Sequence, residues 1–340
     1  MLETTMQKKA QHRRVWVIFT ISLFLGASHA IIACAPLRNA STFQSDCTLD
    51  RYEYASVHMG SRCSIVLYAQ SEPIAAAAAK HAFDAISDVE SALSDYRSSS
   101  ESMKATMSEP NMWIPISPHF ARVLEQSKEM YLISDGAFDP TVGAYTHLWR
   151  DAKSEGRIPS SFEIVQARKL VGFDKVELDI QSGRVRFALS NMILDFGAIG
   201  KGYAADVALK SLQSHGIRSA IIDVGGDLVI GDPPPEHSDG WRVSVQTGYE
   251  EGWETRLHSV AIATSGDYER QYLSDDIRYS HIVDPRSGIG MTNQISVTVI
   301  ADKGATADAV ASVITILGIE ILPTLKVRFP EVQVVSTFEN

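Results

Sequence analysis

Asp308 and Ser312 lie one helical turn apart in the segment ATADAVAS, and together they could bind a hard cation. Apolar residues at helical spacing predict a buried stripe on another face of the same helix, formed by Val310, Val313, Ile314 and Leu317. Because Mg²⁺ prefers oxygen ligands, a carboxylate and a hydroxyl on one face are suitable donors. An aspartate that only stabilises the dipole at a helix start is the alternative, and this pair alone does not exclude it.

A second polar segment, residues 194–206, has the sequence LDFGAIGKGYAAD. A short buried strand at Met192 to Phe196 is predicted to deliver Asp195 to a glycine-rich turn, where backbone can pass close to a ligand. The helix that follows offers free N–H groups to an anion, and Lys201 is placed to meet a phosphate. An ordinary strand–helix turn with a solvated lysine is the alternative.

His281 is placed at a strand end in YSHIVDPRSG, where Asp284-Pro285 begins a turn closed by Gly288. It could transfer a proton or contact a phosphate, although an isolated histidine is more often a structural hydrogen-bonding residue. Three further polar junctions stand at the ends of predicted elements: DGAFDPTVG (135–143), IIDVGGD (221–227), and TSGDYERQY (264–272) with Ser265 and Gly266 in a turn.

Several standard catalytic and nucleotide-binding signatures are absent from the 340 residues: G-x-G-x-x-G after a strand, the Walker spacing, G-x-S-x-G and H-E-x-x-H. The net charge is −10, and it becomes about −13 without the first 33 residues, which carry a net +3. Because nucleic-acid-binding proteins need a basic surface, the composition argues against a nucleic-acid partner. A phosphate ligand must therefore be held locally, by a metal, backbone N–H groups or a few cations.

The N-terminus has the pattern of a targeting segment. Basic residues from Lys8 to Arg14 precede an apolar run from Val15 to Ala33, which is typical of a signal peptide. Ile31-Ile32-Ala33-Cys34 resembles the bacterial lipobox, so residues 1–33 are predicted to be a lipoprotein signal peptide and Cys34 the lipid-anchored first residue. A retained transmembrane anchor and cleavage after Ala30 are alternatives. All three place the body outside the cytoplasm, facing the periplasm or the cell exterior.

The rest of the chain is predicted to be one α+β domain, with mixed sheets and flanking helices, at residues 51–340 after a polar tether at 34–50. The order mixes hairpins with helices, which disfavours a doubly wound parallel sheet. Strands are predicted at 54–70 with a break at Met59-Gly60, and at 176–180, 185–189, 192–196, 220–224, 241–247, 259–264, 294–300 and 332–337. Helices are predicted at 73–96, 118–136, 202–215 and 306–317, with a serine-rich loop at 97–107. Cys47 and Cys63 could form a disulfide in an oxidising compartment, but two cysteines do not prove one.

In this order, the six motifs resemble those of the ApbE family, the FAD:protein FMN transferases, over about Tyr54 to Leu317. Many members of that family are lipoproteins. The resemblance implies that FAD is bound by Met59, Tyr96, Ala137, Phe138, Asp139, Asp195 and Lys201. It also implies that Mg²⁺ is bound by the Ala198 carbonyl, Asp308 and Ser312. Many members have Thr where this chain has Ser312, and the aromatic residue at the position of Tyr96 varies.

The implied reaction is the Mg²⁺-dependent transfer of FMN from FAD to a Thr or Ser hydroxyl of an acceptor protein, with release of AMP. The expected acceptor is a flavoprotein subunit of an extracytoplasmic or membrane electron-transfer system. His281 and Asp308 are the candidates to accept the hydroxyl proton, and His281 is preferred because a metal-bound carboxylate is a poor base. An exported lipoprotein that binds or hydrolyses FAD, and a flavin oxidoreductase, are the alternative functions.

Overall fold

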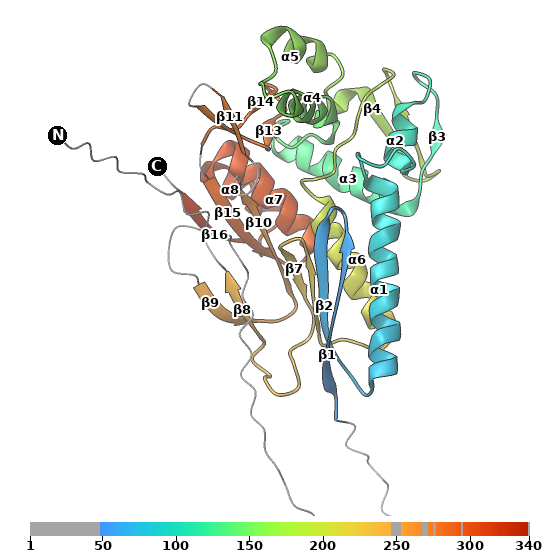
Figure 1. The fold of residues 1–340 in the computed structure, drawn as a ribbon, viewed down its shortest axis with the longest axis vertical. Helices are drawn as coiled ribbons and strands as arrows, with labels where there is room; N and C mark the ends of the chain where they lie inside the picture. The colour runs from blue at the N-terminus through green and yellow to red at the C-terminus, as the bar shows by residue number, and fades with distance from the viewer. Residues whose placement is uncertain (1–47, 246–252, 267–270, 275–276, 294, 339–340) are drawn as a thin grey trace, which may run out of the picture.

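The computed structural model describes residues 48–245, 253–266, 271–274, 277–293 and 295–338. Its largest element is a seven-stranded sheet in which all neighbouring strands are antiparallel (Figure 1). In order across the sheet, the strands are β1 (Asp50–His58), β2 (Ser61–Ala69), β6 (Ala220–Val224), β7 (Asp227–Ile230), β10 (Val260–Gly266), β15 (Ile295–Ala301) and β16 (Gln333–Phe338).

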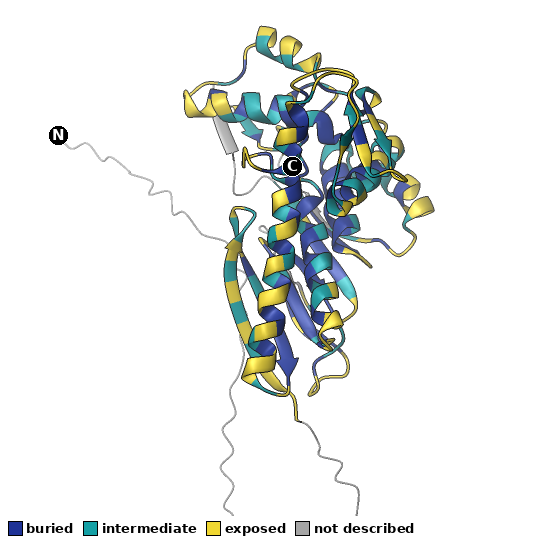
Figure 2. Ribbon diagram, turned by 90° about the vertical axis from the view of Figure 1, so that its right-hand side faces the viewer, coloured by how far each residue is buried: buried dark blue, intermediate teal, exposed yellow. Residues whose placement is uncertain are grey.

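Three helices, α1 (Glu72–Leu93), α6 (Gly200–Ser214) and α7 (Gly304–Leu317), build the main core with the sheet. The inner side of α1 is rich in alanine, which lets the helix approach its neighbours closely, and its outer side is exposed (Figure 2). A second, smaller core joins the sheet to the hairpin of β8 (Trp241–Val245) and β9 (Trp253–Leu257). There the Trp241 ring packs against Tyr68, with the ring centroids 5.6 Å apart.

Shorter elements gather at one end of the sheet, at the top of Figure 1. The helices are α2 (Glu101–Thr106), α3 (Pro118–Ile133), α4 (Gly143–Ser154), α5 (Ser161–Arg168) and, after α7, α8 (Leu322–Arg328). Three single turns of 3₁₀-helix are η1 (Pro140–Val142), η2 (Phe173–Lys175) and η3 (Ile319–Ile321). The strands are β3 (Ile114–Pro115), β4 (Val176–Asp179), β5 (Arg184–Phe187), β11 (Gln271–Ser274), β12 (Ile277–Ser280), β13 (Val283–Asp284) and β14 (Ile289–Gly290).

The predicted α+β class and most of the predicted elements are confirmed. The strand pair breaks at Met59-Gly60, α3 begins at Pro118 directly after Ser117, and β4 and β5 form the expected hairpin. Ser117 caps α3 by accepting a hydrogen bond from the Phe120 N–H at 3.3 Å. Within the described residues, no helix has both the length and the apolar character needed to cross a membrane.

Two of the predicted elements are wrong. The serine-rich segment contains α2, because Ser100 caps it by accepting from the Met103 N–H at 3.1 Å. Residues 192–196 belong to no strand, although Met192, Leu194 and Phe196 are buried, and the Asp195 N–H donates to the Pro140 carbonyl, at 2.7 Å, in the turn before α4. The helices α4 and α5 were not expected, and α1 ends at Leu93, before Tyr96.

The predictions for the N-terminus fall on residues outside the description, which begins at residue 48. These are the signal peptide, Cys34 and Cys47. Cys63 is buried in β2 as a free cysteine, and burial raises the pKa of its thiol to about 11.

Candidate active site

The eleven residues predicted to bind flavin, bind metal or accept a proton all line one cavity of about 1170 Å³. The cavity lies between the main sheet, the N-terminal end of α6, one face of α7 and α4. Its volume exceeds the ~300–1,000 Å³ that is common for small-ligand pockets, which suits a dinucleotide. Residues as far apart in the sequence as Met59 and Ser312 thus meet in one place: Met59, Tyr96, Ala137, Phe138, Asp139, Asp195, Ala198, Lys201, His281, Asp308 and Ser312.

The floor of the cavity is set by a close crossing of α6 and α7. A Cβ on Gly202 would lie 2.1 Å from the Gly304 carbonyl oxygen, so these two backbones touch only because both residues are glycine. Across the crossing, Asp308 accepts a hydrogen bond from the Gly202 N–H at 3.2 Å. In the other direction, Asp206 accepts from the N–H groups of Gly304 at 2.7 Å and Ala305 at 3.0 Å. Each helix therefore caps the other, and the crossing fixes Asp308 in place.

Three charged side chains meet on this floor. Lys201 forms an ion pair with Asp227, whose side chain is almost fully buried. Burial, and then the negative charge of Asp227, raise the pKa of Asp308 to about 7, although Lys201 acts in the opposite direction. When both carboxylates are ionised, the one lysine leaves an excess of negative charge, and a bound cation would favour this state by compensating the charge.

The oxygen donors available on the floor match a hard divalent cation. Ser312 follows Asp308 by one turn of α7, and both line the cavity together with Ala198. The part of the chain that the structure describes contains no group of three or more His, Cys, Asp or Glu side chains placed to hold a metal. A cation here would therefore take neutral oxygens, from the Ser312 hydroxyl and the Ala198 carbonyl, alongside the Asp308 carboxylate. Asp227 was part of a noted motif but was not among the predicted site residues.

Met59 enters the cavity from the tip of the β1–β2 hairpin. Both turn residues have positive φ angles, 51° for Met59 and 67° for Gly60, as in the type I′ turns that suit two-residue hairpins. Methionine rarely adopts a positive φ angle, so the backbone at Met59 is strained. Strained residues of this kind are concentrated at functional sites. Its methyl group reaches the start of α6, where it would lie 3.4 Å from a Cβ on Gly200.

The loop after α3 brings Ala137, Phe138 and Asp139 to the cavity wall. Both carboxylate oxygens of Asp139 accept hydrogen bonds from the protein backbone. Oδ1 accepts from the Thr141 N–H at 2.8 Å, and Oδ2 accepts from the Phe173 N–H at 3.2 Å. Burial raises the pKa of Asp139 despite these hydrogen bonds. The observed contacts of this carboxylate therefore fix the shape of the loop.

Asp195 is held from two sides. Its Oδ1 accepts from the Gly197 N–H at 2.8 Å, and its Oδ2 accepts from the Thr146 hydroxyl at 2.7 Å and from Arg150 at 3.0 Å. Thr146 and Arg150 belong to α4, and both line the cavity, yet neither was predicted. Arg150 also pairs with Asp95, another cavity residue that the sequence interpretation missed. Asp95 directly precedes Tyr96, which was predicted to bind FAD, and this neighbour could have pointed to Asp95 as a site residue.

His281 directly follows β12, as predicted, and its side chain is exposed where it lines the cavity. The turn after it is closed by Gly288, whose N–H donates to the Asp284 carbonyl at 2.8 Å. The predicted turn at Ser265 and Gly266 is wrong, because both residues end strand β10, although both line the cavity. Residues 267–270 of the same motif lie outside the described residues.

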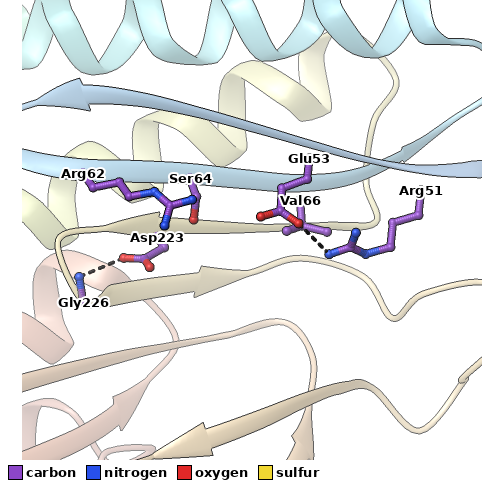
Figure 3. Close-up of a pocket in the computed structure, with 7 residues that line it drawn as sticks. All are labelled: Arg51, Glu53, Arg62, Ser64, Val66, Asp223 and Gly226. Atoms are coloured by element: carbon purple, nitrogen blue, oxygen red, sulfur yellow. Dashed lines mark hydrogen bonds and ion pairs between the residues drawn. The ribbon is translucent and has the colours of Figure 1, made fainter. Parts of the chain in front are cut away.

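A smaller hollow, of about 130 Å³, lies on β1, β2 and the β6–β7 turn (Figure 3). It is too small for a dinucleotide. The N–H of Gly226 donates to Asp223 at 2.8 Å there, and Arg51 bonds Glu53 at 3.1 Å. Asp223 and Gly226 also line the large cavity, so the β6–β7 turn separates the two spaces.

Comparisons with known proteins identify the family of this chain. The ApbE family profile matches residues 59–335. The chain is 29% identical to the FAD:protein FMN transferase of Treponema pallidum (strain Nichols) over 308 residues, which cover 85% of each protein. It is 34% identical to the FAD:protein FMN transferase of Rhodobacter capsulatus over 230 residues, 66% of this chain but 43% of that protein.

Solved structures show the same fold. The apo form of the flavinyl transferase ApbE of Pseudomonas stutzeri matches with a TM-score of 0.76 and 25% identity, over 86% of this chain and 92% of that one. The ApbE protein of Thermotoga maritima matches with a TM-score of 0.75 and 28% identity, over 85% and 94% of the two chains. The chain belongs to the ApbE family, and the relatives that it resembles over most of its length are FAD:protein FMN transferases.

Proposed function

We propose that this protein transfers the FMN moiety of FAD to a Ser or Thr hydroxyl of an acceptor flavoprotein and releases AMP. The observation that carries the proposal is the single cavity. It brings the predicted flavin-binding residues together with an acidic floor that suits a divalent cation. The names of the similar proteins support the same activity.

In this reaction the acceptor hydroxyl oxygen bonds to the FMN-side phosphorus of FAD, and the bond from that phosphorus to the AMP oxygen breaks. A Mg²⁺ ion held by Asp308, Ser312 and the Ala198 carbonyl would supply positive charge for the pyrophosphate oxygens and the leaving AMP. The N–H groups of Gly200 and Gly202 at the start of α6 are already engaged, by the Phe196 carbonyl at 2.7 Å and by Asp308 at 3.2 Å. Lys201, which lines the same cavity, would therefore supply the positive charge for the phosphates from this helix.

We propose that His281 accepts the proton of the attacking hydroxyl. Its side chain is exposed, where the side chain of an acceptor protein can reach it. Asp308 lies buried on the floor, with one oxygen engaged by the Gly202 N–H. Because a carboxylate bound to a cation is a poor base, Asp308 serves as ligand and His281 as base.

The proposed partner is a flavoprotein subunit of an extracytoplasmic or membrane electron-transfer system. This proposal rests on the signal sequence and on the Cys34 lipobox, which together would export the protein and anchor it to a bacterial membrane. A lipid anchor would keep the cavity near membrane-bound acceptors.

The test is incubation of the protein with FAD, Mg²⁺ and an exported redox protein that contains a candidate Ser or Thr. Covalent flavin on the acceptor, detected by mass spectrometry together with free AMP, is the expected result. Free FMN and AMP, with no labelled acceptor in any candidate, would instead identify a hydrolase. A bound flavin that is reduced and reoxidised without cleavage would identify an oxidoreductase.

A further inference from the structure

Arg150 joins the buried carboxylate of Asp95 to the half-buried carboxylate of Asp195 in the cavity wall, and the reaction proposed above gives it no role. We propose that Arg150 is a positioning residue for FAD, which fixes Asp195 and the ring of Tyr96 in one wall against which a planar ring of FAD stacks. The proposal rests on the proposed function only in taking FAD as the ligand.

One guanidinium group connects three segments of the chain. It extends from α4, forms an ion pair with Asp95 in the loop after α1, and donates to Asp195 Oδ2 at 3.0 Å. Asp95 is 8% exposed, so this contact lies inside the protein. Because a planar guanidinium can serve two carboxylates at fixed angles, it sets the distance between the two loops.

Neighbours on α4 keep the cluster charged and in place. His147 Nε2 lies 3.2 Å from Asp95, and the Thr146 hydroxyl donates to Asp195 at 2.7 Å. Burial alone would raise the pKa of Asp95, but the His147 hydrogen bond and the Arg150 charge outweigh it and lower that pKa. The two carboxylates raise the pKa of Arg150 in turn, although burial opposes them. The guanidinium is therefore held by charge on both sides.

The Tyr96 ring lies against this guanidinium. The Arg150 Cζ atom is 4.1 Å from the ring centroid, although Tyr96 is 70% exposed and follows the end of α1. One face of the ring is thus covered by Arg150, and Tyr96 lines the cavity. FAD carries two planar rings, isoalloxazine and adenine, and either can stack on a tyrosine.

Because Arg150 holds the Tyr96 ring in place before FAD arrives, it should strengthen FAD binding. A tyrosine on a loop would otherwise lose conformational freedom when the ligand arrives, and that loss would weaken binding. Arg150 removes this loss and aligns Asp195 with the ring, so the two can contact one ligand together. FAD affinity should then depend on Arg150 even though this side chain is engaged by Asp95, Asp195 and Tyr96 of the protein itself.

The experiment measures FAD binding by calorimetry, with Mg²⁺ and without acceptor, for Arg150→Met and a matched control, Arg157→Met. Arg157 pairs with Glu155 at 2.7 Å and Glu163 at 2.8 Å, but it does not line the cavity. The Kd should rise about tenfold or more for Arg150→Met and stay within about twofold for Arg157→Met. Arg150→Lys keeps the positive charge but loses the planar guanidinium that can bond two carboxylates. Its Kd for FAD should therefore lie between those of the wild type and Arg150→Met.

A double-mutant cycle distinguishes positioning from a general structural effect. Tyr96→Ala should weaken FAD binding as much as Arg150→Met, and the double variant should be little worse than either. Tyr96→Phe keeps the ring and should bind nearly as the wild type. Flavin fluorescence identifies the ring: if the isoalloxazine stacks on Tyr96, the fluorescence quenched in the wild-type complex should recover in both Arg150→Met and Tyr96→Ala, and if adenine stacks there, only the affinities should change.

Wild-type FAD affinity in folded Arg150→Met, or losses that simply add in the double variant, would overturn the proposal. If Arg150→Met does not fold, the comparison of Arg150→Lys with the wild type decides, and equal affinities would count against positioning. Because no acceptor is present, a failure here is separate from a failure of flavin transfer.

Discussion

Asp308 is the residue on which the proposed chemistry depends most. It is a buried acid on the cavity floor, and the buried stripe of α7 holds the helix to the core without it. Asp308→Ala should fold but lose about 100- to 1000-fold in the rate of flavin transfer, because the charged cation ligand is gone. Single-turnover transfer across a Mg²⁺ titration, with circular dichroism as the fold control, measures this.

Ser312 offers a graded comparison on the same helix face. Ser312→Ala should reduce the rate less than Asp308→Ala, since water can replace a neutral ligand, and Ser312→Thr should be tolerated. A folded Asp308→Ala that transfers FMN at the wild-type rate without added Mg²⁺ would show that the metal site lies elsewhere.

The lowered pKa of Asp95 predicts how the stability of the protein depends on pH. Its folded-state pKa is lowered, so it contributes stability above the ordinary pKa of an aspartate, and this contribution is lost as the pH falls through the folded-state value. Asp95→Asn should therefore destabilise the protein by about 2 kcal/mol near pH 7. The difference from the wild type should shrink below about pH 4. Denaturant unfolding of both proteins between pH 3 and 7 measures it, and a constant difference would contradict the assignment.

At the scale of elements, the crossing of α6 and α7 supports the whole floor of the cavity. Gly202→Ala would place its Cβ 2.1 Å from the Gly304 carbonyl oxygen and force the helices apart. Such overpacking should destabilise the fold by about 3 kcal/mol or more and displace Asp308. Gly200→Ala is the control in the same helix, because its Cβ would meet nothing nearer than the flexible end of Met59 at 3.4 Å. Thermal unfolding of both variants should separate them, and equal melting temperatures would rule out the tight crossing.

The cavity as a whole predicts ligand selectivity. We expect Asp195 and Lys201, which lie on its wall and floor, to contact both halves of a dinucleotide. FAD should therefore bind more tightly than riboflavin, which lacks the phosphates and the adenine. Calorimetry with both ligands is the measurement, and equal affinities would mean that the phosphates are not recognised.

The N-terminal segment of the sequence predicts attachment to a membrane. Cys34 should carry lipid, and the mature protein should appear in the membrane fraction, because the lipobox follows a basic and then an apolar segment. Cys34→Ser should release soluble protein or leave the precursor unprocessed. Mass spectrometry of the mature N-terminus provides the check, and an unmodified N-terminus at Ile31 would refute the lipid anchor.

The sequence by itself determined the elements whose signals are local. The β1–β2 hairpin, α3 and α7 follow from periodicity, a cap or a turn within a few residues, and the motif residues were found from their types and order. Part of α4 carried a similar signal, since Tyr145, Trp149 and Ala152 are buried at helical spacing, but it was overlooked.

Only the tertiary structure decided which distant residues meet. The sequence at 192–196 suits a strand, yet no strand pairs with it, because its backbone is bonded to the turn before α4. Nothing near Arg150 in the sequence shows that it would reach Asp95 and Asp195, 55 and 45 positions away. Likewise, Asp206 caps α7 across 98 positions. These contacts arise when the helices and the sheet pack around one core, so their partners are fixed by the fold and not by local spacing.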